Sequence, residues 1–438
     1  MSETPGTVAD KQPSDEEMRK LLKPNPSAEQ ILVALQSNYT EPGQEIKFIK
    51  DLDSYDDRNF LLEVAGTQYL AKVHNGVESK DFIELHAKGE YEKSVIHFQN
   101  SVMEHLNKRG ITTNAPQSTI CGTFPTPACV HSLPVQSDDH SPCDLVVRLL
   151  GWVEGIPMSS VKLLPIESLA DAGRFLGRMS EVLKELDTTT LLAAKRFHQW
   201  DGKNTMGIKD FVGYIQDTRR RSLVTSVLEA FQTEILDTKV YETFATQVIH
   251  GDFNDANMLV NSDYLVSGVI DFGDSVESWR ILDLTVAMAY SMISVYGKNG
   301  RSISAAAALL RGYNSVCPLT EQERKHLILL IACRLSCSVT LGAYTYHKNP
   351  ENEYLLLHAQ PAWEALDLIW GTDETRRSDI ANVINRVFGF ACAAKVDPEV
   401  SIISCSDLSF PDPSIGDPMK EVRQELVDDP TRATKRRR

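Results

Sequence analysis

The sequence predicts an α+β fold with two lobes, a small β-rich lobe followed by a larger, mostly helical lobe. Between residues 45 and 75, apolar and polar residues alternate in three segments separated by Gly and Asp, which is typical of antiparallel strands. After Gly151 the apolar residues instead recur at helical spacing. Two short apolar segments in this second half end on aspartate-containing loops, HGDFNDAN and DFGD, where we expect the functional residues.

We expect four regions along the chain. Residues 1–27 are rich in Ser, Pro, Asp, Glu and Lys and are predicted to be a disordered extension. Residues 28–147 should form the first lobe and residues 148–395 the second. Residues 396–438 are polar and Pro-rich and end in KRRR, which is more typical of a solvated, disordered tail than of a nuclear signal.

The expected elements of the first lobe follow in order. Ser27 is a typical N-cap for a helix over residues 28–39. The segments EIKFIKDLD, NFLLEVAG and TQYLAKVHN are the three alternating strands. A long helix from about residue 80 to Arg109 should end at Gly110, a typical C-terminal glycine. The segments STICGTF, PACVHSLPV and DLVVRLL predict further short strands.

The second lobe is predicted to be helical, with two short strands. Helical periodicity runs through ESLADAGRFLGRMSEVLKELD, FVGYIQDTRRRSLVTSVLEAFQTEIL and EQERKHLILLIACRLSCSVTLGAYTYH. The strand candidates are TQVIH and YLVSGVIDF, and a further helix should begin near Asp283. Each strand therefore leads into one of the two aspartate-containing loops.

Composition limits the class of protein. The chain has 438 residues and a formal net charge of −15, which argues against nucleic acid or an anionic membrane as the main partner. No apolar run is long enough to span a membrane, and the start of the chain has no apolar segment of a secretory signal. The eight cysteines include no CxxC pair and are too dilute for a disulfide scaffold. We therefore expect a cytoplasmic protein without an obligate protein partner.

The loop after the strand TQVIH carries the residues that indicate catalysis. His250-Gly251-Asp252 ends the strand, Asn257 follows, and Asp271 begins DFG after the next strand. This is the arrangement of the protein-kinase catalytic residues, with HGD in place of HRD. A carboxylate at Asp252 would orient an acceptor hydroxyl and take its proton, whereas Asn257 and Asp271 have the oxygen ligands that Mg²⁺ prefers. The simpler interpretation, that these are ordinary loop residues, does not explain their joint spacing.

A nucleotide site is predicted in the first lobe. Lys72, on the third strand, is expected to hold the α and β phosphates. Ser54 and Asn59 belong to the turn SYDDRNF, which has the position of a phosphate-covering loop but lacks GxGxxG; backbone N–H groups can still cradle phosphates there. The two aspartates of this turn would repel phosphate unless they face the metal or the substrate, or cap the turn. Leu150 lies in the segment 147–151, whose backbone should meet the base.

These motifs resemble the aminoglycoside phosphotransferase and choline kinase-like superfamily, which combines HGDxxxxN with a later Asp. Within it the sequence is more similar to the hydroxylysine kinases, through LDSYDDRNF, YLAKVHN, HFQNSVMEHLNKRGI, LVVRLLGWVEGIP, HGDFNDANMLV, GVIDFGD and AYTYHKNPENEYL, which span roughly residues 45–370. The resemblance implies a two-lobed, protein-kinase-like fold. It also implies transfer of the γ-phosphoryl group of GTP, with Mg²⁺, to a small amino-alcohol substrate, 5-hydroxy-L-lysine, in lysine degradation.

The partner of Lys72 stays open at this point. In many kinase-like enzymes a helix glutamate pairs with the strand lysine, and the equivalent position here is Gln99. Gln99 would orient Lys72 by a hydrogen bond but supplies no charge. Glu92, seven residues earlier, is the alternative.

The substrate-reading residues also stay open. Hydroxylysine carries two ammonium groups and a carboxylate. Asp255 and Asp274 are candidates for an ammonium group, with loop capping as the alternative role. Arg148 is a candidate for the carboxylate, with a salt bridge between the lobes as the alternative.

Other functions were weighed against this one. The sequence does not separate GTP from ATP, so GTP depends on the resemblance. A kinase of another amino alcohol, such as homoserine, choline or an aminoglycoside, is the alternative substrate class. A kinase-fold pseudoenzyme is disfavoured because Lys72, Asp252, Asn257 and Asp271 are all present. A protein kinase is disfavoured because no APE-like segment or activation loop follows DFG.

Overall fold

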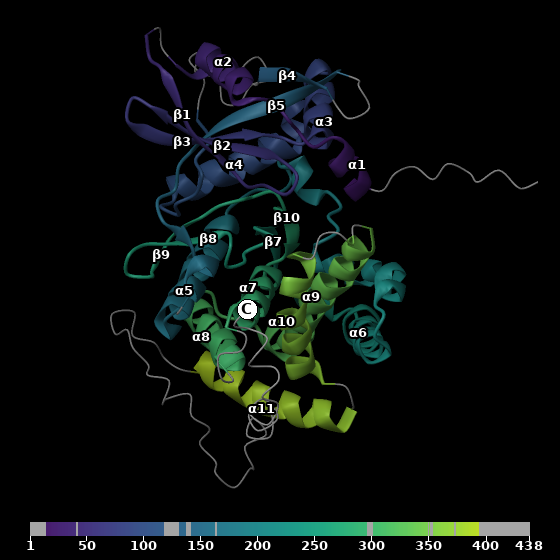
Figure 1. The fold of residues 1–438 in the computed structure, drawn as a ribbon. Helices are drawn as coiled ribbons and strands as arrows, with labels where there is room; N and C mark the ends of the chain where they lie inside the picture. Colours follow the sequence, from purple (N-terminus) through teal and green to yellow (C-terminus); the bar gives the residue numbers. More distant parts are fainter. Residues whose placement is uncertain are drawn as a thin grey trace, which may run out of the picture. The chain divides into compact units, whose positions relative to one another are not determined.

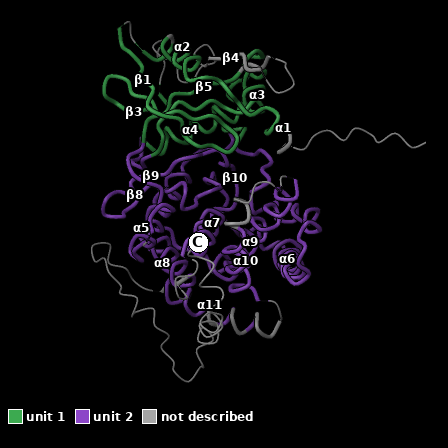
Figure 2. The backbone as a smooth tube through the Cα atoms, in the orientation of Figure 1, with its two compact units in different colours: residues 1–107, 113–152, 191–193 green, residues 108–112, 153–190, 194–438 purple. Residues whose placement is uncertain are grey.

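The computed structural model describes most of the chain in two compact units (Figure 2). The described residues are 15–40, 43–117, 131–136, 142–162, 164–295, 301–348, 350, 354–371 and 374–393. The first unit takes its residues from Met1–Asn107, Thr113–Trp152 and Leu191–Ala193, and the second from Lys108–Thr112, Val153–Thr190 and Ala194–Arg438. The first unit therefore continues past residue 147, where we expected the lobes to divide, up to Trp152.

The first unit is built on a five-stranded antiparallel sheet, as predicted (Figure 1). The strand order is β1-β2-β3-β5-β4. The strands are β1 (Ile46–Leu52), β2 (Arg58–Val64), β3 (Thr67–Val73), β4 (His131–Gln136) and β5 (Pro142–Gly151). The predicted strand STICGTF and the first four residues of PACVHSLPV lie outside the described residues.

One face of this sheet is the apolar core of the unit. Helix α2 (Ala28–Tyr39) covers it with Ile31 and Leu35, which contact Phe60, Ala71 and other alternate strand residues. Ser27 caps α2 through a complete capping box, which confirms the predicted start of this helix. The neighbouring positions on the strands, Asn59 and Lys72 among them, therefore point to the opposite face.

The single long helix predicted after β3 is wrong, because the structure has two. Helix α3 (Gly76–Ala87) is followed by the short 3₁₀ helix η1 (Tyr91–Lys93) and then by α4 (Val95–Lys108). Gly89 has φ +72°, and the N–H of Glu90 donates to the carbonyl of Leu85, so the backbone turns out of α3. The prediction of one helix followed the helical spacing of apolar residues on both sides of Gly89 and did not allow for a break at this glycine.

The prediction that residues 1–27 form a disordered extension also differs from the structure. Helix α1 (Asp15–Leu21) forms within it, and residues 1–14 lie outside the described part. The guanidinium of Arg19 pairs with Asp56 and Glu78, and its carbonyl accepts from Asn75 Nδ2 at 2.8 Å. These contacts with residues distant in the sequence order a segment whose composition alone favours disorder.

The second unit is mostly helical, as predicted, and contains two small antiparallel sheets (Figure 1). One pairs β7 (Thr246–Ile249) with β10 (Val276–Trp279), and the other has the order β6-β8-β9, from Ile156–Pro157, Met258–Val260 and Val266–Val269. The α-helices are α5 (Ile166–Leu183), α6 (Thr218–Ala230), α7 (Ile281–Ser294), α8 (Arg301–Val316), α9 (Glu321–Lys348), α10 (Tyr354–Trp370) and α11 (Glu374–Ala393).

Two predicted elements of the second unit are shorter than expected. The helical stretch from Phe211 is divided: the 3₁₀ segment η4 (Gly202–Tyr214) ends, and α6 begins anew because the Asp217 carboxylate accepts from the N–H of Arg220 at 2.9 Å. The strand YLVSGVIDF is reduced to β9. Tyr264 and Asp271 have left-handed φ angles of +60° and +63°, which interrupt the extended backbone on both sides.

Helix α9 forms the centre of the second unit. Among the described residues it is the one helix long and apolar enough to cross a membrane. However, 78% of its most apolar window is buried inside the structure. A helix that is apolar on all sides and buried is typical of a protein core.

Candidate active site

The loop between β7 and β8 is held in place by His250. This imidazole is fully buried; its Nδ1 accepts from the N–H of Asp252 at 3.3 Å and its Nε2 lies 3.1 Å from the carbonyl oxygen of Ile270. A neutral ring with its proton on Nε2 satisfies both hydrogen bonds. His250 thereby joins the HGD loop to the loop that carries Asp271.

Asp283, in the first turn of α7, fixes the same loop through its backbone N–H groups. Its two carboxylate oxygens accept from the N–H groups of His250 and Gly251, each at 2.8 Å. Burial raises the pKa of this carboxyl, while the two N–H donors act in the opposite direction. From the sequence, Asp283 was expected only near the start of a helix, and this role was not predicted. An aspartate inside the apolar segment RILDLTVAMAY was the available signal.

Gly251 is required at its position by the backbone. Its φ is +85°, and a Cβ there would lie 2.3 Å from the carbonyl oxygen of Asp274. Any side chain would separate the HGD loop from the DFGD loop. The close approach of the two loops therefore depends on this glycine.

The carboxylate of Asp252 is held by three side chains. Its Oδ2 accepts from Asn254 Nδ2 at 2.8 Å and Asn257 Nδ2 at 3.1 Å, and its Oδ1 accepts from Arg334 NH2 at 2.8 Å. The side chain is 24% exposed. Burial raises the pKa of Asp252, and the nearby carboxylates Asp274 and Asp271 raise it further against the opposing effect of Arg334. The result is an oriented carboxylate that remains accessible and is more basic than usual.

Asn257 and Asp271 fit the metal role predicted for them. Asn257 donates through Nδ2 to Asp252, so its amide oxygen is the atom left for a cation, and its backbone carbonyl accepts from the N–H of Ile270 beside Asp271. Asp271 is exposed. Within the described ranges no group of three His, Cys, Asp or Glu gathers as a complete metal site. Mg²⁺ usually takes one or two carboxylates and completes its shell with phosphates and water, so an incomplete protein set is suited to it.

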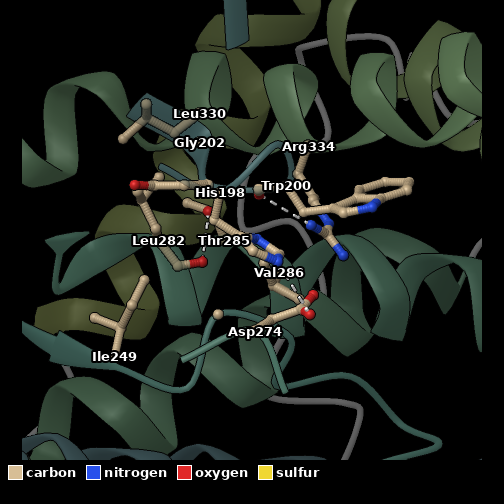
Figure 3. A pocket seen from close by; sticks show the side chains of 12 residues that line it. His198, Trp200, Gly202, Ile249, Asp274, Leu282, Thr285, Val286, Leu330 and Arg334 are labelled. Atoms are coloured by element: carbon tan, nitrogen blue, oxygen red, sulfur yellow. Dashed lines mark hydrogen bonds and ion pairs between the residues drawn. The ribbon is translucent and has the colours of Figure 1, made fainter. Parts of the chain in front are cut away.

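A pocket opens beside these loops (Figure 3). Its aliphatic lining residues are Ile249, Leu282, Val286 and Leu330. The other lining residues are His198, Trp200, Asp201, Gly202, Gly251, Asp274, Thr285 and Arg334. His198 Nε2 lies 3.4 Å from Asp274 Oδ1. Burial raises the pKa of Asp274, and the negative charge of Asp271 raises it further. A substrate with a cationic group would find a carboxylate here.

From the sequence, Arg334 of α9 was not predicted to belong to the site. Its side chain is 7% exposed, and its guanidinium lies over the rings of Trp200 and Tyr290, at 5.0 and 5.4 Å from their centroids. Its Nε is buried without a hydrogen-bond partner. The signal was an arginine in the middle of LILLIACRLSCSV, because a charge buried in an apolar helix requires a partner.

Of the two aspartates proposed to read the substrate, the structure places only Asp274 among the residues that line this pocket. The carboxylate of Asp255 instead accepts a hydrogen bond from the hydroxyl of Ser294, at the end of α7. Its backbone carbonyl accepts from the N–H of Ser159 at 2.9 Å. The structural role weighed for Asp255 therefore agrees with these contacts.

In the first unit, Lys72 forms an ion pair with Asp57, with Nζ and Oδ2 2.5 Å apart. Asn59 lies directly opposite Lys72 in the β2–β3 register, and its buried Oδ1 has no hydrogen-bond partner. Ser54 accepts from the N–H of Asp57 at 3.2 Å and caps the turn. The three predicted phosphate-site residues Lys72, Asn59 and Ser54 thus gather at one end of β2 and β3.

Gln99 and Arg148 do not have the contacts that we expected. Arg148 is 3% exposed and donates to His74 Nε2 at 2.7 Å, Asn100 Oδ1 at 2.5 Å and Gln99 Oε1 at 2.9 Å. The Gln99 amide oxygen therefore binds Arg148, and the anion that pairs with Lys72 in the structure is Asp57. The prediction of Arg148 as a ligand for the substrate carboxylate is wrong, because its guanidinium is buried among these acceptors. Glu92 is exposed on η1.

The segment that includes Leu150, predicted to meet the nucleotide base, has backbone partners on both sides. β5 continues to Gly151 and pairs with β3 along residues 147–151. On its other side the carbonyl of Leu149 accepts from the N–H of Gln117 at 2.9 Å, and the N–H of Gly151 donates to Ala115 at 2.7 Å. The Leu149 carbonyl and the Gly151 N–H, two of the backbone groups expected to meet the base, are therefore already hydrogen-bonded within the protein.

The chain belongs to the phosphotransferase enzyme family, whose model matches residues 48–326. This range includes the turn before β2, Lys72 and the loops around Asp252 and Asp271. The protein is a small-molecule kinase, a phosphotransferase with an alcohol group as acceptor.

Its curated relatives include hydroxylysine kinases. The one from Danio rerio is 28% identical over 373 residues, which cover 82% of this chain and 96% of the relative. The one from Xenopus laevis is 28% identical over 367 residues, covering 79% and 90%. These alignments confirm the resemblance that the motifs indicated.

Solved structures share the fold. An amicoumacin kinase superposes with a TM-score of 0.53 at 15% identity, covering 80% of this chain and 96% of that chain. A microcompartment-associated aminopropanol kinase has a TM-score of 0.51 at 16% identity, covering 79% and 98%. At these identities the likeness concerns the fold alone, and it confirms the predicted kinase-like architecture.

Proposed function

We propose that this protein transfers the γ-phosphoryl group of GTP to the hydroxyl of 5-hydroxy-L-lysine, with Asp252 as the base. The observation that carries the proposal is the carboxylate of Asp252, which Asn254, Asn257 and Arg334 hold beside the pocket. The similarity to hydroxylysine kinases supports the choice of substrate. A cytoplasmic location and a place in lysine degradation belong to the same proposal.

Asp252 would act on the acceptor hydroxyl. One oxygen of its carboxylate accepts the hydroxyl hydrogen bond, which directs the substrate oxygen towards the phosphorus atom. The raised pKa of Asp252 suits it to take the proton as the new bond to phosphorus forms. Asn254 and Asn257 keep the carboxylate in one rotamer, so little reorganisation is needed during transfer.

Lys72, Asn59 and Ser54 would hold the phosphates of the nucleotide. Asn257 and Asp271 would hold Mg²⁺, which neutralises the charge that develops on the phosphate oxygens when it is bound. The crowding of these carboxylates agrees with this assignment, because Asp271 and Asp274 raise the pKa of Asp252, and Asp271 raises the pKa of Asp274. A bound cation would relieve this repulsion. The preference for GTP rests on the resemblance.

Asp274 is the residue that we assign to the substrate. In hydroxylysine an ammonium group is attached to the carbon next to the one that carries the hydroxyl. When Asp252 holds that hydroxyl, the ammonium must lie within a few ångströms of it. Asp274 lines the pocket and is near enough to raise the pKa of Asp252 by its charge, so it is suited to receive the cation.

A substrate panel tests the proposal. The purified protein is assayed with GTP or ATP and Mg²⁺ against hydroxylysine, lysine, homoserine, choline and an aminoglycoside. We expect GDP release with hydroxylysine and none with lysine, which lacks the hydroxyl. Turnover with another amino alcohol but not with hydroxylysine would reject the substrate and retain the kinase.

The role of Asp252 is tested in the same assay. Asp252→Asn should reduce kcat by at least about a thousandfold while nucleotide still raises the melting temperature. The exposed Asp263→Asn is the matched control and should keep full activity. Wild-type turnover in Asp252→Asn would remove Asp252 from the mechanism.

A further inference from the structure

The ion pair between Lys72 and Asp57 replaces the contact that a helix glutamate makes in many kinase-like folds. Lys72 Nζ and Asp57 Oδ2 are 2.5 Å apart, and both side chains are mostly buried. In α4, Gln99 has the position of that glutamate, but it accepts from Arg148 at 2.9 Å. The structure therefore gives Lys72 an anionic partner from the turn before β2.

The β-strand register explains why Asp57 faces Lys72. Asn59 is directly opposite Lys72 in the β2–β3 register. Asp57 lies two residues earlier, in the bend that leads into β2, and its ion pair places its carboxylate on the same face as Lys72. Asp57 is then the diagonal neighbour of Lys72 across the two strands, a distance that a lysine side chain can span.

Asp57 is itself fixed on two sides. Its Oδ1 accepts from the N–H of Asn75 at 2.8 Å, and its own N–H donates to Ser54 Oγ at 3.2 Å. Burial alone would raise the pKa of Asp57, but the ammonium of Lys72 beside it holds that pKa well below its ordinary range. The carboxylate is therefore ionised and keeps one orientation.

The turn around Asp57 is also held by Lys23, which follows α1, and by Asn75, which also contacts α1. Lys23 Nζ donates to the carbonyls of Ser54 at 3.0 Å and Tyr55 at 2.7 Å. Asn75 Nδ2 donates to the carbonyls of Asp56 at 3.0 Å and Arg19 at 2.8 Å. A turn held by this many backbone contacts can position a charged side chain without the flexibility of a glycine-rich loop.

We propose that Asp57 is the positioning residue that orients Lys72 towards the phosphates of the nucleotide, in the role that a helix glutamate has elsewhere. The proposal rests on the proposed function of Lys72. It also resolves the question of the acidic turn, because Asp57 meets the phosphates only through the lysine that it holds.

A double-mutant cycle tests this role. Mg²⁺–GTP binding is measured by calorimetry on the full chain for Asp57→Asn, Lys72→Met and the double variant. Asn at position 57 can still accept from the N–H of Asn75, so the turn should fold. We expect Asp57→Asn to weaken Mg²⁺–GTP binding by roughly 10- to 100-fold, the usual effect of losing a charged hydrogen bond. In the Lys72→Met background the same change should cost less than about twofold.

Two comparisons separate positioning from a general structural effect. Asp57→Glu keeps the charge and should recover part of the lost affinity. Asp51→Asn, which removes an exposed ion pair with Arg58 at the end of β1, should bind like the wild type. Guanosine without phosphates should bind the wild type and Asp57→Asn equally, because Lys72 is expected to touch only phosphate.

The outcomes distinguish the two proposals. If Lys72→Met binds Mg²⁺–GTP and Mg²⁺–ATP as the wild type does, the nucleotide role of Lys72 fails. If Lys72→Met loses affinity but Asp57→Asn does not, the positioning role of Asp57 alone is rejected. Equal losses from Asp57→Asn in both backgrounds would also reject it, because the effect would then not pass through Lys72.

Discussion

At the scale of single residues, the site depends on charges that compensate one another in a partly buried volume. Asp252 lies close enough to Asp271 and Asp274 to feel both carboxylates, and Arg334 is the cation that bonds to it directly. An unpaired charge in this environment would raise the free energy of the folded protein, so the charge of each of these side chains depends on the charges of its neighbours. Arg334 therefore holds the pKa of Asp252 below the value that it would otherwise have.

Loss of Arg334 should change the pH dependence of the reaction. Arg334→Met removes the positive charge that opposes the raised pKa of Asp252, so that pKa rises further. In the proposed mechanism Asp252 accepts a proton only when it is ionised, so activity should be lost at a higher pH as the solution is acidified. We expect kcat/KM at pH 7 to fall by about a hundredfold and the acidic limb of its pH profile to move upward.

The control for this experiment is Arg178→Met. Arg178 is exposed on α5 and lies over the ring of Phe175 at 5.7 Å, so it has a similar aromatic contact away from the pocket. It should leave the profile unchanged. An acidic limb that stays in place in Arg334→Met would show that Arg334 does not tune Asp252.

At the scale of secondary structure elements, close helix packing supports the loops. Helices α5 and α8 approach through Gly173 and Gly177 on one side and Gly312 on the other. A Cβ at Gly312 would lie 1.9 Å from the carbonyl oxygen of Ala170, which is shorter than any van der Waals contact. The backbones of the two helices are therefore in direct contact.

Gly312→Ala should separate these helices. We expect the free energy of unfolding to fall by about 2 kcal/mol or more, because the added methyl group requires a backbone shift. Chemical denaturation followed by circular dichroism measures it. Gly389→Ala in α11, where a Cβ meets nothing within 4 Å, is the control and should be neutral or slightly stabilising. An unchanged stability of Gly312→Ala would contradict the packing described for α5 and α8.

At the scale of the whole molecule, the net charge of −15 makes acidic residues the main source of pH-dependent stability. Asp56 is an informative member of this group. Burial raises its pKa to about 6, and the guanidinium of Arg19, 3.5 Å away, only partly offsets that effect. The folded state therefore binds a proton at Asp56 more tightly than the unfolded state does.

This difference predicts how stability varies with pH. The contribution of Asp56 is most favourable below its unfolded pKa of 3.8 and is lost as the pH rises through about 6. Asp56→Asn should consequently stabilise the protein at pH 7.5 by on the order of 1–3 kcal/mol and have almost no effect near pH 4. Thermal unfolding at both pH values measures it, with Asp263→Asn as the control. A gain in stability that is equal at both pH values would rule out this account.

Much of the fold could be predicted from local patterns, and the errors share one cause. The alternating strands β1 to β3, the capped helix α2 and the helical second unit follow from periodicity and capping, which depend on residues close in the sequence. The break between α3 and α4 at Gly89 and the helix α1 were missed. Both depend on contacts or turns that compete with local propensity.

The sequence by itself determined the chemistry of this protein: a carboxylate, an amide and a second carboxylate at kinase spacing, and a lysine on the third strand. These residues are contiguous in motifs, so their order is visible in one dimension. Only the tertiary structure decided their partners. Arg334 reaches Asp252 from 82 residues away, Asp57 reaches Lys72 from the turn before the neighbouring strand, and Arg148 binds Gln99 from another element. Such pairings arise from packing and burial, which bring distant charges together because neither can be buried alone.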